Sequence, residues 1–327
     1  MKKPEYKVPS MHDIESAEKN GKIVVSTFSG TGGSCLGYSM AGFDVVWASE
    51  FVTAAQECYA LNHPETILDT RDIRDVTGAE ILKSIGREKG DVDILDGSPP
   101  CAAFSSAGTG SKTWGDVKTY SDVEQRVDDL FFEYARIVDE IQPRVFVAEN
   151  VAGLVRGKSK GYFLQILAAL KACGYRVSVQ KLNAKWLGVP QARERLIFIG
   201  VREDLQKNPV HPSPLSYSYT MRDVFPYMQA VRHEQGGFNT VAAIDRASPT
   251  ITASQCRMIV EKSDDLDQFK ERRLTIAELK KVCAYPDDFQ LVGSYAQQWE
   301  RLGRSVPPVM MQHVAQKIYE TILSDDE

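Results

Sequence analysis

The stretch IVVSTFSGTGGSCLG, residues 23–37, decides the fold because an apolar run leads directly into a glycine-rich turn. The apolar part predicts a strand over Ile23 to Phe28, and the glycines after it let a ligand approach the backbone at the start of a helix. Glu50 ends the next apolar run, about 20 residues downstream, where a carboxylate accepts hydrogen bonds from ribose hydroxyls. Cys35 stands where a dinucleotide fingerprint has its third glycine, which disfavours nicotinamide cofactors. The pattern favours an adenosyl-type ligand, and a tight turn without a ligand is the alternative.

Short apolar runs alternate along the chain with longer segments of helical period. Apolar residues recur at helical spacing between Val127 and Ile141 and between Phe163 and Leu170. This alternation predicts a doubly wound, Rossmann-like α/β fold with a mostly parallel sheet covered on both faces. The predicted strands are Ile23 to Phe28, Asp44 to Ala48, Val92 to Leu95, Val145 to Ala148, Val177 to Leu182 and Leu196 to Gly200.

The pattern changes after Val201, where prolines and a Ser/Tyr-rich stretch replace the periodic runs. We expect a catalytic, cofactor-binding domain over residues 1–201 and 274–327, and a smaller domain or large insertion over residues 202–273. Thr275 and Glu278 form a capping box that predicts the start of a helix. A final helix is expected from about Val309 to Leu323, after two prolines.

Composition narrows the function classes. The 327 residues are 43% hydrophobic and carry a formal net charge of −5, so any surface for nucleic acid must be a local basic cleft. The first 21 residues contain no apolar stretch of signal-peptide or membrane length, which predicts an intracellular protein. Six cysteines without Cys-x-x-Cys spacing argue against disulfide and zinc frameworks, so we expect no metal site.

Cys101 and Glu149 follow two of the predicted strands. Cys101 ends the segment DGSPPC, residues 96–101, and the two prolines before it direct the backbone from the strand end into the cleft where doubly wound folds bind ligands. A thiolate that adds to an electron-poor ring, with an acid that protonates a ring nitrogen, activates a base such as cytosine. A buried, inert cysteine and a solvated loop carboxylate are the alternatives.

Five ordered motifs resemble the C5-cytosine-specific DNA methyltransferases, and together they span residues 23 to about 323. Only residues 202–273 lack such motifs, and this is where the family keeps its variable target-recognition region. The motifs are FSGTGG (residues 28–33), PPCAAFS (99–105), ENV (149–151), GVPQARER (188–195) and GRSVPP (303–308).

The resemblance implies a DNA (cytosine-5-)-methyltransferase that uses S-adenosylmethionine and flips its target base out of the duplex. Cys101 would attack carbon-6, Glu149 would protonate or hydrogen-bond ring nitrogen 3, and Arg195 would lower the pKa of the thiol and hold the exocyclic oxygen. The implied DNA-binding residues are Arg193, which would meet phosphate, Ser105 and Asn150. The implied cofactor-binding residues are Phe28, Ser29, Gly30, Gly32, Gly33, Glu50, Asp72, Ile73, Gly97, Arg304, Ser305 and Val306.

Two residues depart from the family pattern. Ala102 replaces the glutamine that usually follows the catalytic cysteine, and Arg304 replaces the usual asparagine near the methionine end of the cofactor. A cation there would repel a sulfonium unless an anion lay between them. Arg304 would point to solvent or DNA phosphate, pair with the carboxylate of the cofactor, or bind the extra carboxylate of carboxy-S-adenosylmethionine in a cytosine carboxymethyltransferase.

Two rival functions are an RNA cytosine-5 methyltransferase and a catalytically dead DNA-binding relative. The presence of Cys101, Glu149 and Arg195 argues against the dead relative, and the separate recognition-like region favours duplex DNA over RNA. The expected setting is a monomeric, cytoplasmic enzyme of a bacterium or phage, without membrane attachment, acting on double-stranded DNA. A restriction nuclease would be its expected partner. The target sequence is not encoded in any motif of residues 202–273.

Overall fold

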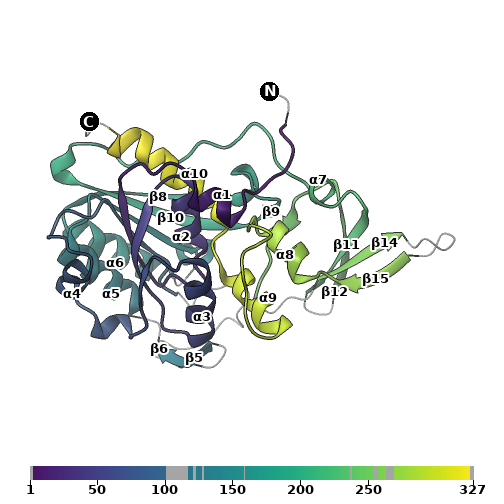
Figure 1. The fold of residues 1–327 in the computed structure, drawn as a ribbon, viewed down its shortest axis with the longest axis horizontal. Coiled ribbons are helices and arrows are strands. Elements are labelled where there is room, and N and C mark those ends of the chain that lie inside the picture. The colour runs from purple at the N-terminus through teal and green to yellow at the C-terminus, as the bar shows by residue number, and fades with distance from the viewer. Residues whose placement is uncertain are drawn as a thin grey trace.

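A computed structural model describes residues 3–100, 117–120, 123–126, 129–157, 159–235, 238–253, 257–262 and 269–324. Figure 1 shows two lobes: a large lobe built on a central sheet, and a small lobe that carries α7, α8, α9 and a second sheet. The predicted α/β class is confirmed. No helix in these residues is long and apolar enough to cross a membrane.

The central sheet has seven strands, and six of them run parallel. β10 is antiparallel to both of its neighbours, because only the short segment 184–193 joins it to β8 and no crossover helix intervenes. β3 is a strand that the sequence analysis missed. In sheet order the strands are β3 (Ile67–Asp69), β2 (Asp44–Ser49), β1 (Ile23–Thr27), β4 (Ile94–Gly97), β7 (Val145–Val151), β10 (Glu194–Arg202) and β8 (Tyr175–Asn183).

Helices cover both faces of this sheet, as the near-continuous apolar runs of its central strands predict. One face packs against α4 (Gly78–Ser84), α5 (Leu130–Ile141) and α6 (Ser159–Ala172). The other packs against α2 (Gly33–Met40) and α10 (Pro308–Ile318), which a π-turn extends over Tyr319–Leu323. α3 (Thr53–Asn62) lies beside α2, and Tyr59 of α3 packs against Cys35 of α2. The predicted C-terminal return to the catalytic sheet is therefore present.

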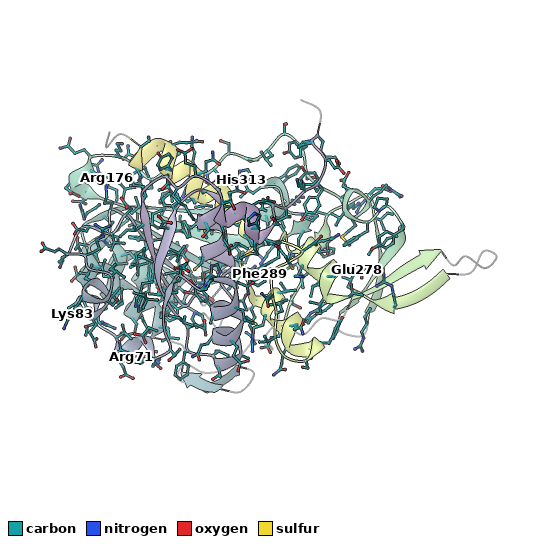
Figure 2. All side chains as sticks on the ribbon, in the orientation of Figure 1. Arg71, Lys83, Arg176, Glu278, Phe289 and His313 are labelled. Atoms are coloured by element: carbon teal, nitrogen blue, oxygen red, sulfur yellow. The ribbon has the colours of Figure 1, made fainter. Side chains whose placement is uncertain are left out.

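The small lobe has its own core, which joins α1 (Met11–Glu15), α7 (Met221–Val224), α8 (Ile276–Val282) and α9 (Tyr295–Arg304). The predicted capping box at α8 is confirmed, since Thr275 and Glu278 bond each other's backbone amides. This core extends past residue 273, the boundary that the sequence predicts for the insertion. Figure 2 labels Glu278 in this lobe, where its carboxylate also pairs with Arg272 at 2.6 Å.

The strands outside the central sheet are short. The small-lobe sheet runs in the order β12 (Phe238–Ala243), β11 (Met228–Gln235), β14 (Arg257–Lys262) and β15 (Phe269–Arg273). The sequence analysis found no periodic run there. β9 (Gln191–Ala192) pairs with β13 (Ser248–Pro249), and this pairing ties the small lobe to the motif that precedes β10. β5 (Val117–Tyr120) and β6 (Val123–Arg126) form a hairpin.

Candidate active site

The predicted site residues converge where the strand order reverses. The chain passes from β1 outward to β3 and then crosses back to β4, so the carboxyl ends of β1 and β4 border a crevice. Thr27 pairs with Gly97, and Gly97 pairs with Ala148, which places Glu149 of β7 beside the two loops that leave β1 and β4. Three motifs that are far apart in sequence therefore meet at one edge of the sheet.

Asn150 anchors the segment that leads to the predicted nucleophile. Its side-chain amide donates to the Pro99 carbonyl over 3.1 Å, and its oxygen accepts from the Val151 amide over 2.8 Å. Asn150 is buried, so these contacts differ from the predicted DNA contact and give it a positioning role. Cys101 and Ser105 themselves lie outside the described residues.

Glu149 and Arg195 form an ion pair across neighbouring antiparallel strands. Their Oε1 and Nε atoms lie 2.6 Å apart, and their side chains are only 11% and 13% exposed. Strand register explains the contact, because Glu149 lies opposite Ile197 and the Arg195 side chain reaches it from two residues away on the same face. A carboxyl group and a guanidinium group thus line the cleft together.

The motif that supplies Arg195 has two further polar residues with structural roles. Arg193 is 1% exposed, and its guanidinium donates to the carbonyls of Ile251 at 2.9 Å, Gly303 at 3.1 Å and Arg304 at 3.3 Å. Burial lowers the pKa of Arg193 to about 9. The predicted phosphate contact of Arg193 is thus wrong for this structure, because the side chain holds the small lobe against the sheet. The buried Gln191 acts in the same way, accepting from the Ile251 amide.

The turn after β1 has the features expected of a cofactor site. Phe28 has a positive φ of 54°, and Gly30 has a φ of 57° with open space where a side chain would stand. Glu50 closes this turn: its carboxylate accepts from the Gly30 and Val52 amides, both at 2.7 Å. Burial raises the pKa of Glu50. A carboxylate held beside an open backbone position suits a ribose, because each of its oxygens has a second lone pair that can accept from a hydroxyl.

The contacts of Gly33 identify Tyr285 as a residue of this region that the sequence analysis missed. A Cβ atom at Gly33 would overlap the Tyr285 hydroxyl and the Val306 carbonyl, so the predicted cofactor turn is packed directly against the C-terminal motif. Ala284, just before this tyrosine, has a left-handed φ of 57° that turns the ring inward. No spacing rule links residue 285 to residue 33. Gly32 is likewise packed against His63, and Gly97 against Tyr134.

The residues that are predicted to bind the adenine of the cofactor lie on a short 3-10 turn. Asp72 caps this turn by accepting from the Arg74 amide at 3.1 Å, and it also pairs with the Arg74 guanidinium at 2.9 Å. Ile73, the next residue, is buried in the large core. Asp72 therefore lies just past the end of β3, held by a neighbouring cation, and its role at the adenine stays a prediction.

Arg304 turns away from the turn after β1. Its Nε atom contacts Glu300 at 2.8 Å, one helical turn earlier in α9, and the side chain is 44% exposed. Ser305 bonds back to the Leu302 carbonyl at 2.9 Å, while Val306 is buried against Gly33. Of the three interpretations, the solvent-facing one fits this arrangement. Within the described part of the chain, no group of acidic, histidine or cysteine side chains has the geometry of a metal site.

Comparison with known proteins identifies the family. A family model for C-5 cytosine-specific DNA methylases matches residues 23–235 and 215–320.

The chain belongs to the C-5 cytosine-specific DNA methylase family.

Individual relatives agree with this assignment over nearly the whole chain. The type II methyltransferase M.NgoPII of Neisseria gonorrhoeae is 28% identical over 95% of this chain and 99% of its own length. The type II methyltransferase M1.HphI of Haemophilus parahaemolyticus is 29% identical over 90% of this chain and 86% of its own length. The crystal structure of a Spodoptera frugiperda DNMT2 mutant shares the fold, with a TM-score of 0.67 at 19% identity over 89% of this chain and 98% of that chain.

Family membership makes this protein a DNA (cytosine-5-)-methyltransferase, and it implies S-adenosylmethionine as the methyl donor. The residues present fit that donor. Glu50 and the open Gly30 position suit the ribose. When bound, S-adenosylmethionine supplies the methyl group as an electrophile.

Proposed function

We propose that this methylase acts on a flipped cytosine in duplex DNA through a covalent bond to Cys101. The supporting observation is the Glu149–Arg195 pair, which lines the cleft beside the Pro99 segment that leads to Cys101. A nucleophile, an acid and a cation are the groups that addition to a pyrimidine ring requires. The Asn150–Pro99 hydrogen bond would hold the nucleophile's segment against the strand that carries the acid.

The chemical steps balance with these residues. The Cys101 thiolate bonds to carbon-6 of cytosine, the ring double bond moves electron density to carbon-5, and Glu149 holds the proton shared with ring nitrogen 3. Carbon-5 would then take the methyl group of the donor, and the electron pair of the broken carbon–sulfur bond would stay on the sulfur, which leaves uncharged. A base, water being sufficient, removes the carbon-5 proton, and the electron pair left behind expels the Cys101 thiolate. Arg195 stays charged throughout, since it orients the Glu149 carboxylate and favours the thiolate form nearby.

Duplex DNA is the proposed substrate because the small lobe stands beside the large lobe as a separate unit that could contact the strands around the target base (Figure 1). A target base stacked inside a duplex would be out of reach of Glu149, which is largely buried in the cleft. Extrusion of the base costs a few kcal/mol of stacking and pairing energy, which contacts to the displaced strand would offset. We propose that residues 202–273 supply the target recognition.

The test begins with the modified sequence. Bisulfite sequencing of DNA from an expression host carrying the enzyme would locate the target, and a duplex with 5-fluorocytosine at that position would then trap the adduct. With S-adenosylmethionine, the wild type and a Cys173→Ser control should form a stable complex seen by intact mass, and Cys101→Ser should form none. An adduct that survives Cys101→Ser would overturn the assignment of the nucleophile.

The same expression host and enzyme also serve to identify the transferred group and the nucleic acid that is modified. We expect nucleoside mass analysis to show 5-methylcytosine in DNA, because Arg304 is turned toward Glu300 and solvent. A carboxymethylcytosine mass with carboxy-S-adenosylmethionine would instead support the carboxymethyltransferase. Modified RNA with unmodified DNA would support the RNA enzyme.

A further inference from the structure

A second carboxylic acid is buried at the end of β4, and the mechanism above does not use it. Asp96 is 1% exposed, and its two oxygens accept hydrogen bonds from the hydroxyls of Ser26 at 3.0 Å and Tyr38 at 3.2 Å. Within the described part of the chain, Asp96 has no ion-pair partner at salt-bridge distance. Ionising a buried carboxyl group that only hydroxyl groups contact costs free energy. A cation close to the carboxylate would offset that cost.

Asp96 is connected to the turn after β1. The Ser29 hydroxyl contacts the Ser26 hydroxyl at 3.0 Å, and Ser26 in turn donates to Asp96, so a chain of hydroxyls leads from the turn to the acid. Asp96 pairs with Ser26 across β1 and with Val147 across β7, one pleat before Glu149. The acid therefore lies inside the sheet, next to the turn after β1 that would hold the cofactor.

Other titratable groups surround Asp96 on every side, but few change charge near neutral pH. Burial, with a smaller contribution from the Glu149 carboxylate, raises the pKa of Asp96 to about 7, although the hydrogen bonds from Ser26 and Tyr38 act to lower it. On α2, burial raises the pKa of Cys35 to about 11 and also raises that of Tyr38. Tyr59 of α3 and Tyr134 of α5 also face Asp96, and their pKa values are raised by burial.

We propose that Asp96 is a specificity-determining residue that lets the enzyme bind its positively charged donor more tightly than the neutral-sulfur product. This inference rests on the proposed function only in requiring that S-adenosylmethionine binds at the turn after β1. The donor and S-adenosylhomocysteine share every group except the methyl group and the charge on sulfur. Contacts at Glu50 or Gly30 therefore act equally on both, whereas an ionised Asp96 attracts only the sulfonium.

The charge state of Asp96 and donor binding are linked. If ionised Asp96 increases donor affinity about tenfold, a bound donor must favour the ionised acid by the same factor. Donor binding near pH 7 should then release a fraction of a proton, and product binding should release none from this group. The ratio of product to donor dissociation constants should rise as the pH rises through 7, because Asp96 then loses its proton.

Isothermal titration calorimetry tests the proposal without turnover. Dissociation constants for S-adenosylmethionine and S-adenosylhomocysteine would be measured from about pH 6 to about pH 8.5, with proton release taken from buffers of different ionisation enthalpy. For the wild type we expect the ratio to rise about tenfold. Asp96→Asn, which keeps the shape and one acceptor oxygen but cannot ionise, should give a flat ratio and no linked proton.

Asp93→Asn is the matched control. Asp93 is also buried next to β4, but it lies at the amino end, where it accepts from the Ile23 amide and pairs with Arg144. This variant should keep the wild-type pH dependence. A flat ratio in the wild type, or the same rise in Asp96→Asn, overturns the role of Asp96 while leaving the proposed function intact. Failure of both compounds to bind would instead contradict the proposed function.

Discussion

Replacing Arg193 by methionine tests whether this arginine stabilises the fold or binds DNA. The guanidinium donates to three carbonyls, those of Ile251, Gly303 and Arg304, and it is almost fully buried. Methionine fills much of the same volume but donates no hydrogen bond. The three carbonyls would then lose a charged donor in a site that water reaches poorly.

The expected cost follows from these contacts. A buried polar group left without its partner costs about 1–3 kcal/mol, and removing one member of a buried charged network costs about 3–5 kcal/mol. Eliminating the buried cation offsets part of the three losses, so we expect a net destabilisation of about 4 kcal/mol. In a chain of this length, that corresponds to a fall in Tm of about 6 °C.

Two assays distinguish the roles. Thermal unfolding measures the loss of stability, and DNA affinity measured against salt concentration counts phosphate contacts, since each contributes about −0.9 to the logarithmic slope. Arg193→Met should lower Tm and keep the slope. Lys181→Met, at an exposed surface pair with Glu194, should shift stability by less than about 0.5 kcal/mol. An unchanged Tm with a slope shallower by about one would refute the structural reading of Arg193.

Three further predictions follow from single contacts. Asn150→Ala removes the hydrogen bond to Pro99, so it should lower kcat at least tenfold and cost about 1–2 kcal/mol of stability. A stable variant with full kcat would contradict the anchoring role of Asn150. Arg304→Asn breaks the exposed ion pair with Glu300, so the rate of methyl transfer and the Tm should stay near the wild-type values. A loss of donor affinity in calorimetry would instead show that Arg304 contacts the cofactor. Burial lowers the pKa of His63 from 6.5 to about 4, so the folded state binds fewer protons than the unfolded state and stability should fall as pH drops from about 6.5 toward 4. In thermal melts His63→Asn should lose less stability over that range than wild type, and an equal loss would show that other groups dominate.

Much of the large lobe could be predicted from local patterns. Each predicted strand overlaps an observed one within a few residues, because central strands buried on both faces must be continuously apolar. β3 was missed because an edge strand of three residues carries no such run. The small-lobe sheet was missed because residues 202–273 contain no periodic run of apolar residues.

The candidate site, like the fold, could be predicted only in part from the sequence. Sequence motifs were enough to propose Glu149, near the carboxyl end of β7, and Arg195, near the start of the antiparallel strand β10. The burial of Arg193 was not predictable, because the carbonyls that it binds come from residues 251, 303 and 304. Asp96 carried a weak local signal, an acid inside an apolar run, whose meaning depends on hydroxyls from β1 and α2.

The sequence by itself determined the family and the doubly wound class, and it supplied the proposed reactive groups, because these depend on backbone periodicity and on chemistry carried within short segments. Tertiary structure alone decided which charged groups face the cleft and which hold the lobes together. The physical reason is that burial and partnership arise only where distant segments meet. Two arginines in one motif, Arg193 and Arg195, carry the same charge, yet one binds carbonyls in the interior and the other binds the Glu149 carboxylate in the cleft.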